Sequence, residues 1–348
     1  MPSQQSLIEV QATDETFADE FNRLAYESGW TDGLPVVPPT QPRLMSFIHA
    51  SGRPAEDVVG EIAPKRGAAT VEKVAANAIM AGCQPEYMPV LLAVCEALKE
   101  PEFNLDGIQS TTNPAGVAVI VNGPVRREIG MNWGRNCLGP GNKANATIGR
   151  AVRLILLNIG GGVPDIVDKA VHGYPGKYTF CFAENEEDSP WEPLHVEQGF
   201  RREDSTVTIV GAQGVLNNLT ANQTTGRDMM ELVAQSLTYL GCNNVLLGAG
   251  QILVLLAPGH ADLLSKEGFT KQTTRQFLYD RTGVPEAALP PTIRKERVDR
   301  MTVNGTIRAV KSPEDILLSV AGGPEPYHVA VAHTFGYTRA ITKLVRGP

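Results

Sequence analysis

Two short runs of consecutive apolar residues constrain the fold most strongly. GVAVIVNGP and QILVLLAPG are rich in branched aliphatic side chains, and each ends in a Gly/Pro turn signal. Such runs predict strands that are buried on both faces. Each run leads to a predicted helix and then to another predicted strand, which indicates an α/β protein. The two apolar runs are residues 116–124 and 251–259, the helices 144–159 and 270–282, and the last strands 177–184 and 315–323.

The chain shows the same order of elements twice. A predicted strand, a helix and a Gly-Cys pair precede each apolar run, and the first copy carries a longer insert at 84–115. We therefore expect two degenerate strand-helix repeats that form mostly parallel sheets covered by helices. The alternative is a loose self-similarity that any α/β chain would show. The early elements are the strand 57–63 and helix 70–81 in the first copy, and the strand 205–212 and helix 227–240 in the second.

The predicted organisation has three parts. Residues 1–56 form an N-terminal helical arm with a Pro-rich loop, 57–200 form the first repeat with a joining segment, and 201–348 form the second repeat. In the arm, apolar residues at helical spacing predict a helix over 14–29. Three prolines in WTDGLPVVPPT exclude a helix over 30–40 and predict an extended loop, which a short helix at 41–51 follows.

Composition excludes several classes of protein. The 348 residues are 42% hydrophobic and carry a net charge of −7 without a basic run, which argues against disorder and against nucleic-acid binding. The first residues lack the features of a signal peptide, and the apolar runs are too short to span a membrane. Five cysteines without a CxxC pair favour free thiols in a reducing compartment. We expect a cytoplasmic protein.

The segment 172–200 is the densest polar stretch and the first candidate for chemistry. Glu184 and Glu186 follow a predicted strand, and open α/β sheets place ligands at the carboxyl ends of strands. With His195 they could act as general acid and base. A divalent metal bound by His172, His195 and these carboxylates is a mechanistic alternative, although no HxH or HExxH pattern is present. The other reading is a solvated acidic loop.

The Gly- and Asn-rich segment 132–150 is the second candidate, because it precedes a predicted helix. Free N–H groups at a helix start can bind an anion. The segment has neither the Walker A spacing nor the GxGxxG pattern, and a Gly-rich turn with an Asn cap is the alternative. The predicted substrate-binding residues are Asn132, Asn136, Lys143, Asn145 and Arg150, with Lys177 from the neighbouring polar segment.

Asp32 lies in the Pro-rich loop, where stiffness lowers the cost of ordering a site residue. We expect Asp32 to orient a substrate. The alternative is that the loop only attaches the N-terminal arm to the body of the protein. The cysteines are poor candidates for a nucleophile. Cys83 and Cys242 follow predicted helix ends, where the dipole raises the pKa of a thiol, and Cys137 in the Gly-rich loop is only slightly better placed.

Four long stretches carry a family resemblance. WTDGLPVVPPT, TVEKVAANAIMAGCQPEYMPV, GPGNKANATIGRAVRLILLNIGG and GYPGKYTFCFAENEEDSPWEPLHVEQGF resemble a largely uncharacterised bacterial family related to the UGSC-motif (seleno)proteins. The resemblance covers most of the chain and implies that these loops belong together. The chain lacks a UGSC or CGSC tetrapeptide, so no redox role follows from the motif.

The sequence thus favours an enzyme, a lyase or hydrolase, that acts on a small polar or anionic metabolite by acid–base chemistry. Glu184, Glu186 and His195 are the predicted proton-transfer residues. Two alternatives remain open, a non-catalytic subunit of a multiprotein reductase and a metabolite-binding protein. Two similar halves also suggest a homo-oligomer.

Overall fold

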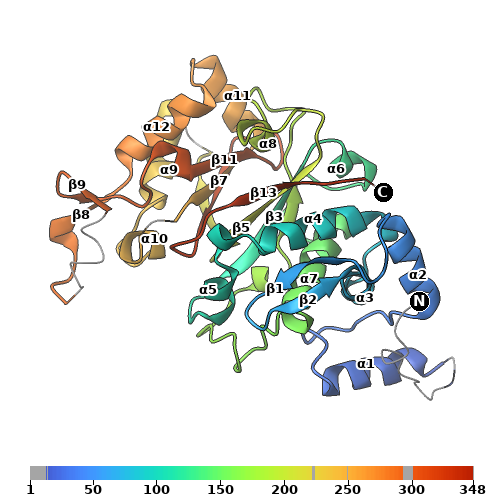
Figure 1. The fold of residues 1–348 in the computed structure, drawn as a ribbon. Helices are drawn as coiled ribbons and strands as arrows, with labels where there is room; N and C mark the ends of the chain where they lie inside the picture. Colours follow the sequence, from blue (N-terminus) through green and yellow to red (C-terminus); the bar gives the residue numbers. More distant parts are fainter. Residues whose placement is uncertain (1–12, 14, 222–223, 249, 293–300, 348) are drawn as a thin grey trace.

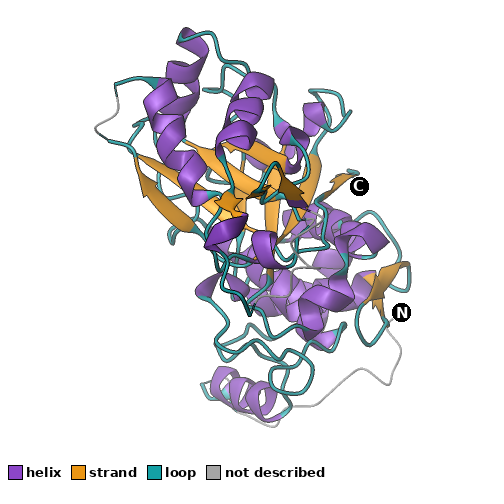
Figure 2. Cartoon of the chain, turned by 90° about the vertical axis from the view of Figure 1, so that its left-hand side faces the viewer, coloured by secondary structure: helices purple, strands orange, loops and turns teal. Residues whose placement is uncertain are grey.

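Two four-stranded sheets packed face to face, with helices on both outer sides, make up the body of the protein (Figures 1 and 2). The computed structural model describes residues 13, 15–221, 224–248, 250–292 and 301–347. The first twelve residues, for which the sequence predicts no signal peptide, lie outside the described residues. Within the described ranges no helix is both long and apolar enough to cross a membrane.

The first sheet has the strand order β13-β5-β3-β4. Its strands are β3 (Gly116–Asn122), β4 (Cys181–Ala183), β5 (Thr206–Ala212) and β13 (Ile341–Leu344). β3 pairs parallel with β4 and antiparallel with β5, and β5 pairs antiparallel with β13. The sheet is therefore mixed.

The second sheet has the order β11-β7-β12-β6 and the same pairing pattern. Its strands are β6 (Leu216–Leu219), β7 (Ile252–Leu256), β11 (Ile316–Val320) and β12 (His328–His333). β7 pairs parallel with β11 and antiparallel with β12, which pairs antiparallel with β6. The expectation of mostly parallel sheets is thus wrong for the described strands, since each large sheet has one parallel and two antiparallel pairings.

The layer arrangement explains why the strands are apolar along their whole length. In β3, Val117, Val119 and Val121 face the helices of the first half, whereas Ala118 and Ile120 face the second sheet. Side chains alternate between the two faces of a strand, and here both faces are covered. Full burial in a helix-covered sandwich produces the same apolar pattern as a parallel sheet, so the pattern could not distinguish them.

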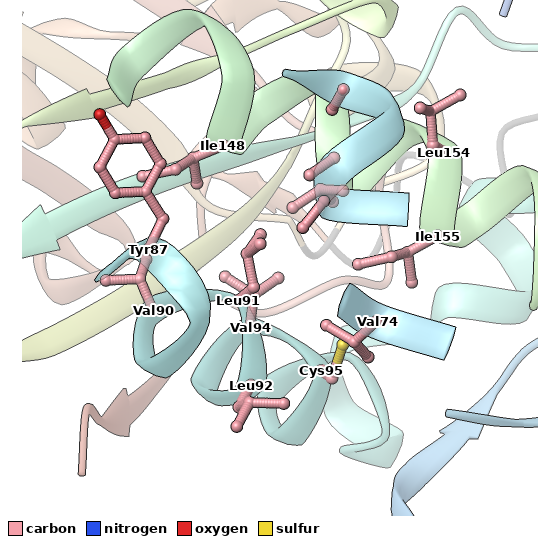
Figure 3. Close-up of a cluster of buried hydrophobic side chains, with 14 of the residues drawn as sticks. Val74, Tyr87, Val90, Leu91, Leu92, Val94, Cys95, Ile148, Leu154 and Ile155 are labelled. Carbon is pink, nitrogen blue, oxygen red and sulfur yellow. The ribbon is translucent and has the colours of Figure 1, made fainter. Parts of the chain in front are cut away.

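Helices of the first half cover the outer face of the first sheet. α4 and α7 pack on the strands, while α2 and α3 pack against these helices. Figure 3 shows part of this core, where Leu91 and Val94 of α4 lie near Ile148 and Ile155 of α7. The elements are α2 (Gln41–Ala50), α3 (Val71–Ala81), α4 (Met88–Leu98) and α7 (Lys143–Asn158). The stretch 84–115, expected to be an insert, thus supplies a central core helix.

The outer face of the second sheet packs against three helices that form a separate core. These are α9 (Gly226–Ser236), α11 (Pro258–Lys266) and α12 (Lys271–Arg281). The remaining helices and small strands lie around the two halves. They are α1 (Phe17–Glu27), α5 (Leu105–Ser110), α6 (Val125–Glu128), α8 (Leu194–Glu197), α10 (Asn243–Leu246), β1 (Val58–Ile62), β2 (Gly67–Thr70), β8 (Val284–Pro285), β9 (Thr302–Val303) and β10 (Thr306–Ile307).

The chain crosses between the sheets twice. β5 belongs to the first sheet and the next strand, β6, to the second, while β12 belongs to the second and β13 returns to the first. In Figure 1 the red β13 runs alongside β5. Residues beyond 200 therefore complete the first sheet, and the boundary at 200 does not separate one sheet from the other.

Three local expectations differ from the structure. The predicted strand 177–184 shortens to β4, because a 3-10 turn at Pro175–Lys177 precedes it. The predicted strand 57–63 is β1, which pairs with β2 in an antiparallel hairpin. The strand expected to match it in the second repeat, β5, instead pairs with β3 in the first large sheet. The two Gly-Cys pairs also differ, since Gly82 ends α3 whereas Cys242 precedes α10.

Candidate functional site

The residues that the sequence singles out divide between the two ends of β3. At its first residue, Gly116 lies against Lys177 and Tyr174, while at its last residue Asn122 binds Glu184 and Glu186. Seven residues at about 3.3 Å per residue separate these ends by roughly 20 Å. The structure therefore contains two candidate sites, here called the amino-end site and the carboxyl-end site.

Glu184 is the centre of the carboxyl-end site and joins the two sheets. Its carboxylate accepts hydrogen bonds from Asn122 Nδ2 at 2.6 Å, from Leu194 N at 2.8 Å and from Val320 N at 3.3 Å. Lys271 Nζ lies 3.9 Å away, and the Glu184 side chain is buried. These contacts come from β3, β11, α8 and α12. Glu184 thus connects β3 of the first sheet with β11 of the second.

Glu186 and its neighbour Glu187 are also engaged. Glu186 accepts from Gly123 N at 2.7 Å and from Asn122 at 3.0 Å, and it pairs with Arg126 at 3.1 Å. Burial opposes ionisation of Glu187, but hydrogen bonds from Arg126 and Arg127 outweigh it and lower the pKa of Glu187 to about 2. These carboxylates and arginines line an adjoining cavity of about 380 Å³, where their charges are already paired with one another.

His195 is fully buried within α8 at the same end. Its Nε2 lies 3.4 Å from the carbonyl oxygen of Arg202, and Nδ1 has no hydrogen-bond partner among the described residues. The imidazole does not line any of the cavities described below. The geometry gives His195 no direct route to a ligand, so its predicted role in proton transfer stays without support.

The amino-end site is a cavity of about 870 Å³, which is the size of a metabolite pocket. The Pro-rich loop, the end of α7 and the segment 163–178 enclose it. Its walls carry basic, acidic and aromatic side chains close together. The lining residues used below are Asp32, Arg153, Asp168, His172, Tyr174, Pro175, Lys177 and Tyr178.

Asp32 lines this cavity and pairs with Arg150, which lies 118 residues away in the chain. Arg150 Nε donates to Asp32 Oδ2 at 2.9 Å, and Nη2 donates to Oδ1 at 2.8 Å, which is a bidentate pair. The Asp32 side chain is only 2% exposed. Burial alone would raise the pKa of Asp32, but the hydrogen bonds and charge of Arg150 outweigh it and hold that pKa below its usual value.

The same pair docks the Pro-rich loop. Arg150 also donates to the carbonyl oxygens of Leu34 and Pro35, and Asp32 accepts from Leu34 N within a turn. The loop is held from its other side by Asn22, whose Oδ1 accepts from Val36 N at 2.6 Å. The loop therefore attaches the arm, as one of the two predictions has it, and also forms a wall of the cavity; the orienting role of Asp32 stays a prediction.

Arg153, Asp168 and Lys177 form the charged floor of the cavity. Lys177 Nζ donates to Asp168 Oδ2 at 2.6 Å, whereas Arg153 Nη2 lies 3.8 Å from the same oxygen. Arg153 Nη2 also donates a long hydrogen bond, 3.3 Å, to the carbonyl oxygen of Gly162. Its side chain is 11% exposed. Burial lowers the pKa of Arg153, and the charges of Asp168 and Asp32 only partly oppose that shift.

Arg153 is thus a largely buried cation. Its carboxylate neighbour, Asp168, lies closer to Lys177 and accepts a hydrogen bond from that lysine. A carboxylate bound beside it would supply the hydrogen bonds and negative charge that Asp168 provides incompletely. His172 and Tyr178 also line this cavity and are exposed, so they add an imidazole and a phenol to its wall. The site can therefore bind an anion next to groups able to exchange protons.

The Gly- and Asn-rich loop is mainly held by its own amides. Asn142 caps α7, and Asn145 is buried and bonds to Asn132 and to the Cys137 carbonyl. Asn132 and Asn136 also bond within the loop. Lys143 is exposed and does not line the amino-end cavity. Of the predicted binding residues, Lys177 lines that cavity and Arg150 pairs with Asp32 in its wall, while the others lie in or beside this loop.

The five cysteines are buried and free, as the sequence predicts. Burial raises the pKa of Cys83 to about 12 and that of Cys137 to about 11. Neither thiol is therefore a ready nucleophile.

The proposed metal ligands are not brought together. His172 lines the amino-end cavity, while His195 is buried at the carboxyl end beyond β4. Across the part of the chain that the structure describes, no three His, Cys, Asp or Glu side chains form a group suited to a metal ion. Comparison of the sequence with family models and with curated proteins finds no match.

Sequence reasoning missed Arg153, Asp168 and Tyr174. Arg153 did carry a signal, since it is a charged residue inside the apolar run RAVRLILLNI, three residues after Arg150. Residues at i and i+3 share a helix face, so both arginines point to the same side of α7. Asp168 had no comparable signal, because only the fold of the 163–170 loop places it beside Lys177.

Proposed function

We propose that the protein is an enzyme that binds a small carboxylate-bearing metabolite in the amino-end cavity and catalyses a proton transfer, as a lyase or hydrolase would. The observation that carries the proposal is Arg153, a buried guanidinium on a metabolite-sized cavity, 3.8 Å from a carboxylate that Lys177 already occupies. Arginine binds carboxylates through two parallel hydrogen bonds, which would also orient the substrate.

The other side chains would have distinct roles. The Lys177–Asp168 pair supplies a proton donor held in place by a charged acceptor, and His172 supplies an imidazole on the cavity wall that can act as acid or base. Asp32 would act as a positioning residue, because its pairing with Arg150 holds the loop that closes one side of the cavity. This assignment replaces Glu184, Glu186 and His195 as the favoured proton-transfer residues.

Ligand-observed NMR titration with acetate and succinate tests the binding step. We expect Arg153→Met to weaken binding at least tenfold, because it removes a charge-assisted bidentate contact. Arg135→Met is a matched control, since Arg135 is exposed and pairs with Glu325 outside the cavity. Equal binding by the native protein and by Arg153→Met, with circular dichroism showing that both are folded, would refute the assignment.

A metabolite-binding protein is the second candidate, and one observation favours it. Both buried carboxylates of the cavity, Asp32 and Asp168, are paired with basic side chains. Such pairing is expected of a site that binds a ligand without reacting with it. Incubating bound carboxylates in D2O discriminates the two. Product signals or deuterium incorporation beside the carboxylate support an enzyme, and His172→Asn should slow them without changing affinity. Tight binding with neither signal supports the binding protein.

We also infer that the two halves derive from one duplicated unit. The inference is supported by the matching orders β4-β3-β5-β13 and β11-β7-β12-β6, with a helical crossover between each parallel pair. Kinship with the UGSC-motif family stays a proposal that rests on the four quoted stretches.

A further inference from the structure

A second cavity adjoins the amino-end cavity and differs from it in chemistry. It has a volume of about 560 Å³, and Tyr174 and Pro175 line both cavities. The second cavity has mainly apolar walls, with Asn145 and Thr179 as polar exceptions. Its apolar lining includes Cys137, Leu138, Pro140, Phe180 and Val215.

Two of these apolar side chains are conspicuously exposed. Leu138 is 41% exposed and Val215 is 42% exposed, although they line a concave surface. Burying apolar surface of this kind under a ligand is favourable, at about 25 cal/mol per Å² removed from water. The cavity thus has both the room and the driving force for an apolar group.

Tyr174 forms part of the wall between the cavities and is held by several contacts. The Tyr174 hydroxyl donates to the Ala212 carbonyl oxygen at 3.3 Å, and its ring packs against Gly176 and near Gly116. Glycine at position 176 is needed for this packing, because a Cβ there would lie 2.3 Å from the Tyr174 ring. A ligand extending past Tyr174 and Pro175 would therefore meet a charged site on one side and an apolar site on the other.

We propose that the substrate is a carboxylate with an apolar tail, an alkyl chain or an aromatic ring, whose carboxylate binds Arg153 and whose tail occupies the cavity beside Val215. The proposal rests on the carboxylate site proposed above and specifies its substrate class. The proposal treats the two cavities as subsites for one ligand because Tyr174 and Pro175 line both of them.

The test compares acetate, hexanoate and 4-phenylbutyrate by ligand-observed NMR titration. Each methylene transferred from water raises affinity up to about fourfold. We expect hexanoate and 4-phenylbutyrate to bind at least tenfold more tightly than acetate. Val215→Asp should abolish that gain and leave acetate affinity unchanged, since Val215 does not line the amino-end cavity.

Leu219→Asp is the matched control, because Leu219 is 61% exposed on the neighbouring strand β6 and lies outside both cavities. Leu219→Asp should keep the full gain in affinity of the longer carboxylates over acetate. If acetate binds in an Arg153-dependent way but a longer chain adds nothing, the two-part substrate is overturned while the carboxylate site stands. A gain that survives Val215→Asp also overturns it. If no carboxylate binds, both proposals fail.

Discussion

Replacing Arg150 with Met should expose how strongly the Asp32–Arg150 pair supports the cavity wall. The substitution keeps most of the aliphatic volume of the side chain but removes its charge and its two hydrogen bonds to Asp32. Asp32 would remain almost fully buried, at 2% exposure, without a counter-charge. Breaking a buried pair on one side costs about 3–5 kcal/mol of the free energy of unfolding. We expect a loss of that size at pH 7.

The pH dependence of this loss has a definite sign. In the native protein the folded-state pKa of Asp32 is lowered, so its contribution is present above its unfolded pKa of about 3.9 and disappears as pH falls through the folded value. In Arg150→Met, burial without a partner raises the folded pKa instead. The penalty at pH 7 should then shrink as acid protonates Asp32, so native and variant converge as the pH decreases.

Urea unfolding followed by circular dichroism at pH 7 and pH 5 measures both effects. Arg346→Met is the control, because Arg346 is 69% exposed in its pair with Glu96 and should cost less than about 1 kcal/mol. Adding Asp32→Asn to Arg150→Met should restore at least about 1 kcal/mol by removing the stranded charge. A loss below about 1 kcal/mol, or no restoration by the double variant, would refute the reasoning.

Three further predictions concern stability and thiol reactivity. Burial raises the pKa of Cys83 and Cys95 to about 12, so iodoacetamide at pH 8 should label them at least 100-fold more slowly than in the unfolded chain, as mass spectrometry can show. Gly149→Ala should cost about 1–3 kcal/mol in urea unfolding, because its Cβ would lie 2.8 Å from the Phe180 backbone nitrogen, whereas a Cβ at Gly134 would meet only Asn132 Oδ1 at an ordinary contact distance of 3.6 Å, so Gly134→Ala should cost less. Burial lowers the pKa of His260 to about 4. The unfolded chain therefore binds the proton first, and stability should decrease by up to about 3 kcal/mol as pH falls from 6.5 to 4; His260→Asn should flatten that slope.

Local pattern was sufficient for most central elements. The apolar runs became β3 and β7, and the 3–4 spacing after the Gly- and Asn-rich loop became α7, because each pattern reports burial along one element. The sheet pairing was not accessible in the same way. A strand buried on both faces has the same composition in a parallel sheet and in a helix-covered sandwich, so β5 and β12 were not recognised as antiparallel neighbours.

The candidate residues show the same division. Asp32, Arg150, His172 and Lys177 were all predicted from the sequence, but as members of three separate segments. Nothing in their spacing indicated that Asp32, His172 and Lys177 line one cavity with Arg150 paired to Asp32, or that Glu184 lies at the other end of β3. Residue type was sufficient to predict which side chains carry charge. Only the fold shows which of these side chains lie close together.

The sequence by itself determined the α/β class, the two apolar strands, the capped helices and the supply of charged side chains in polar loops. Those properties depend on neighbours within one turn or one strand. The tertiary structure decided that the sheets are mixed and that the chain crosses from one sheet to the other and back. It also decided that Arg153 lies beside Asp168, which is paired with Lys177. These features depend on contacts between distant segments, which burial patterns constrain only weakly because many packings bury the same residues.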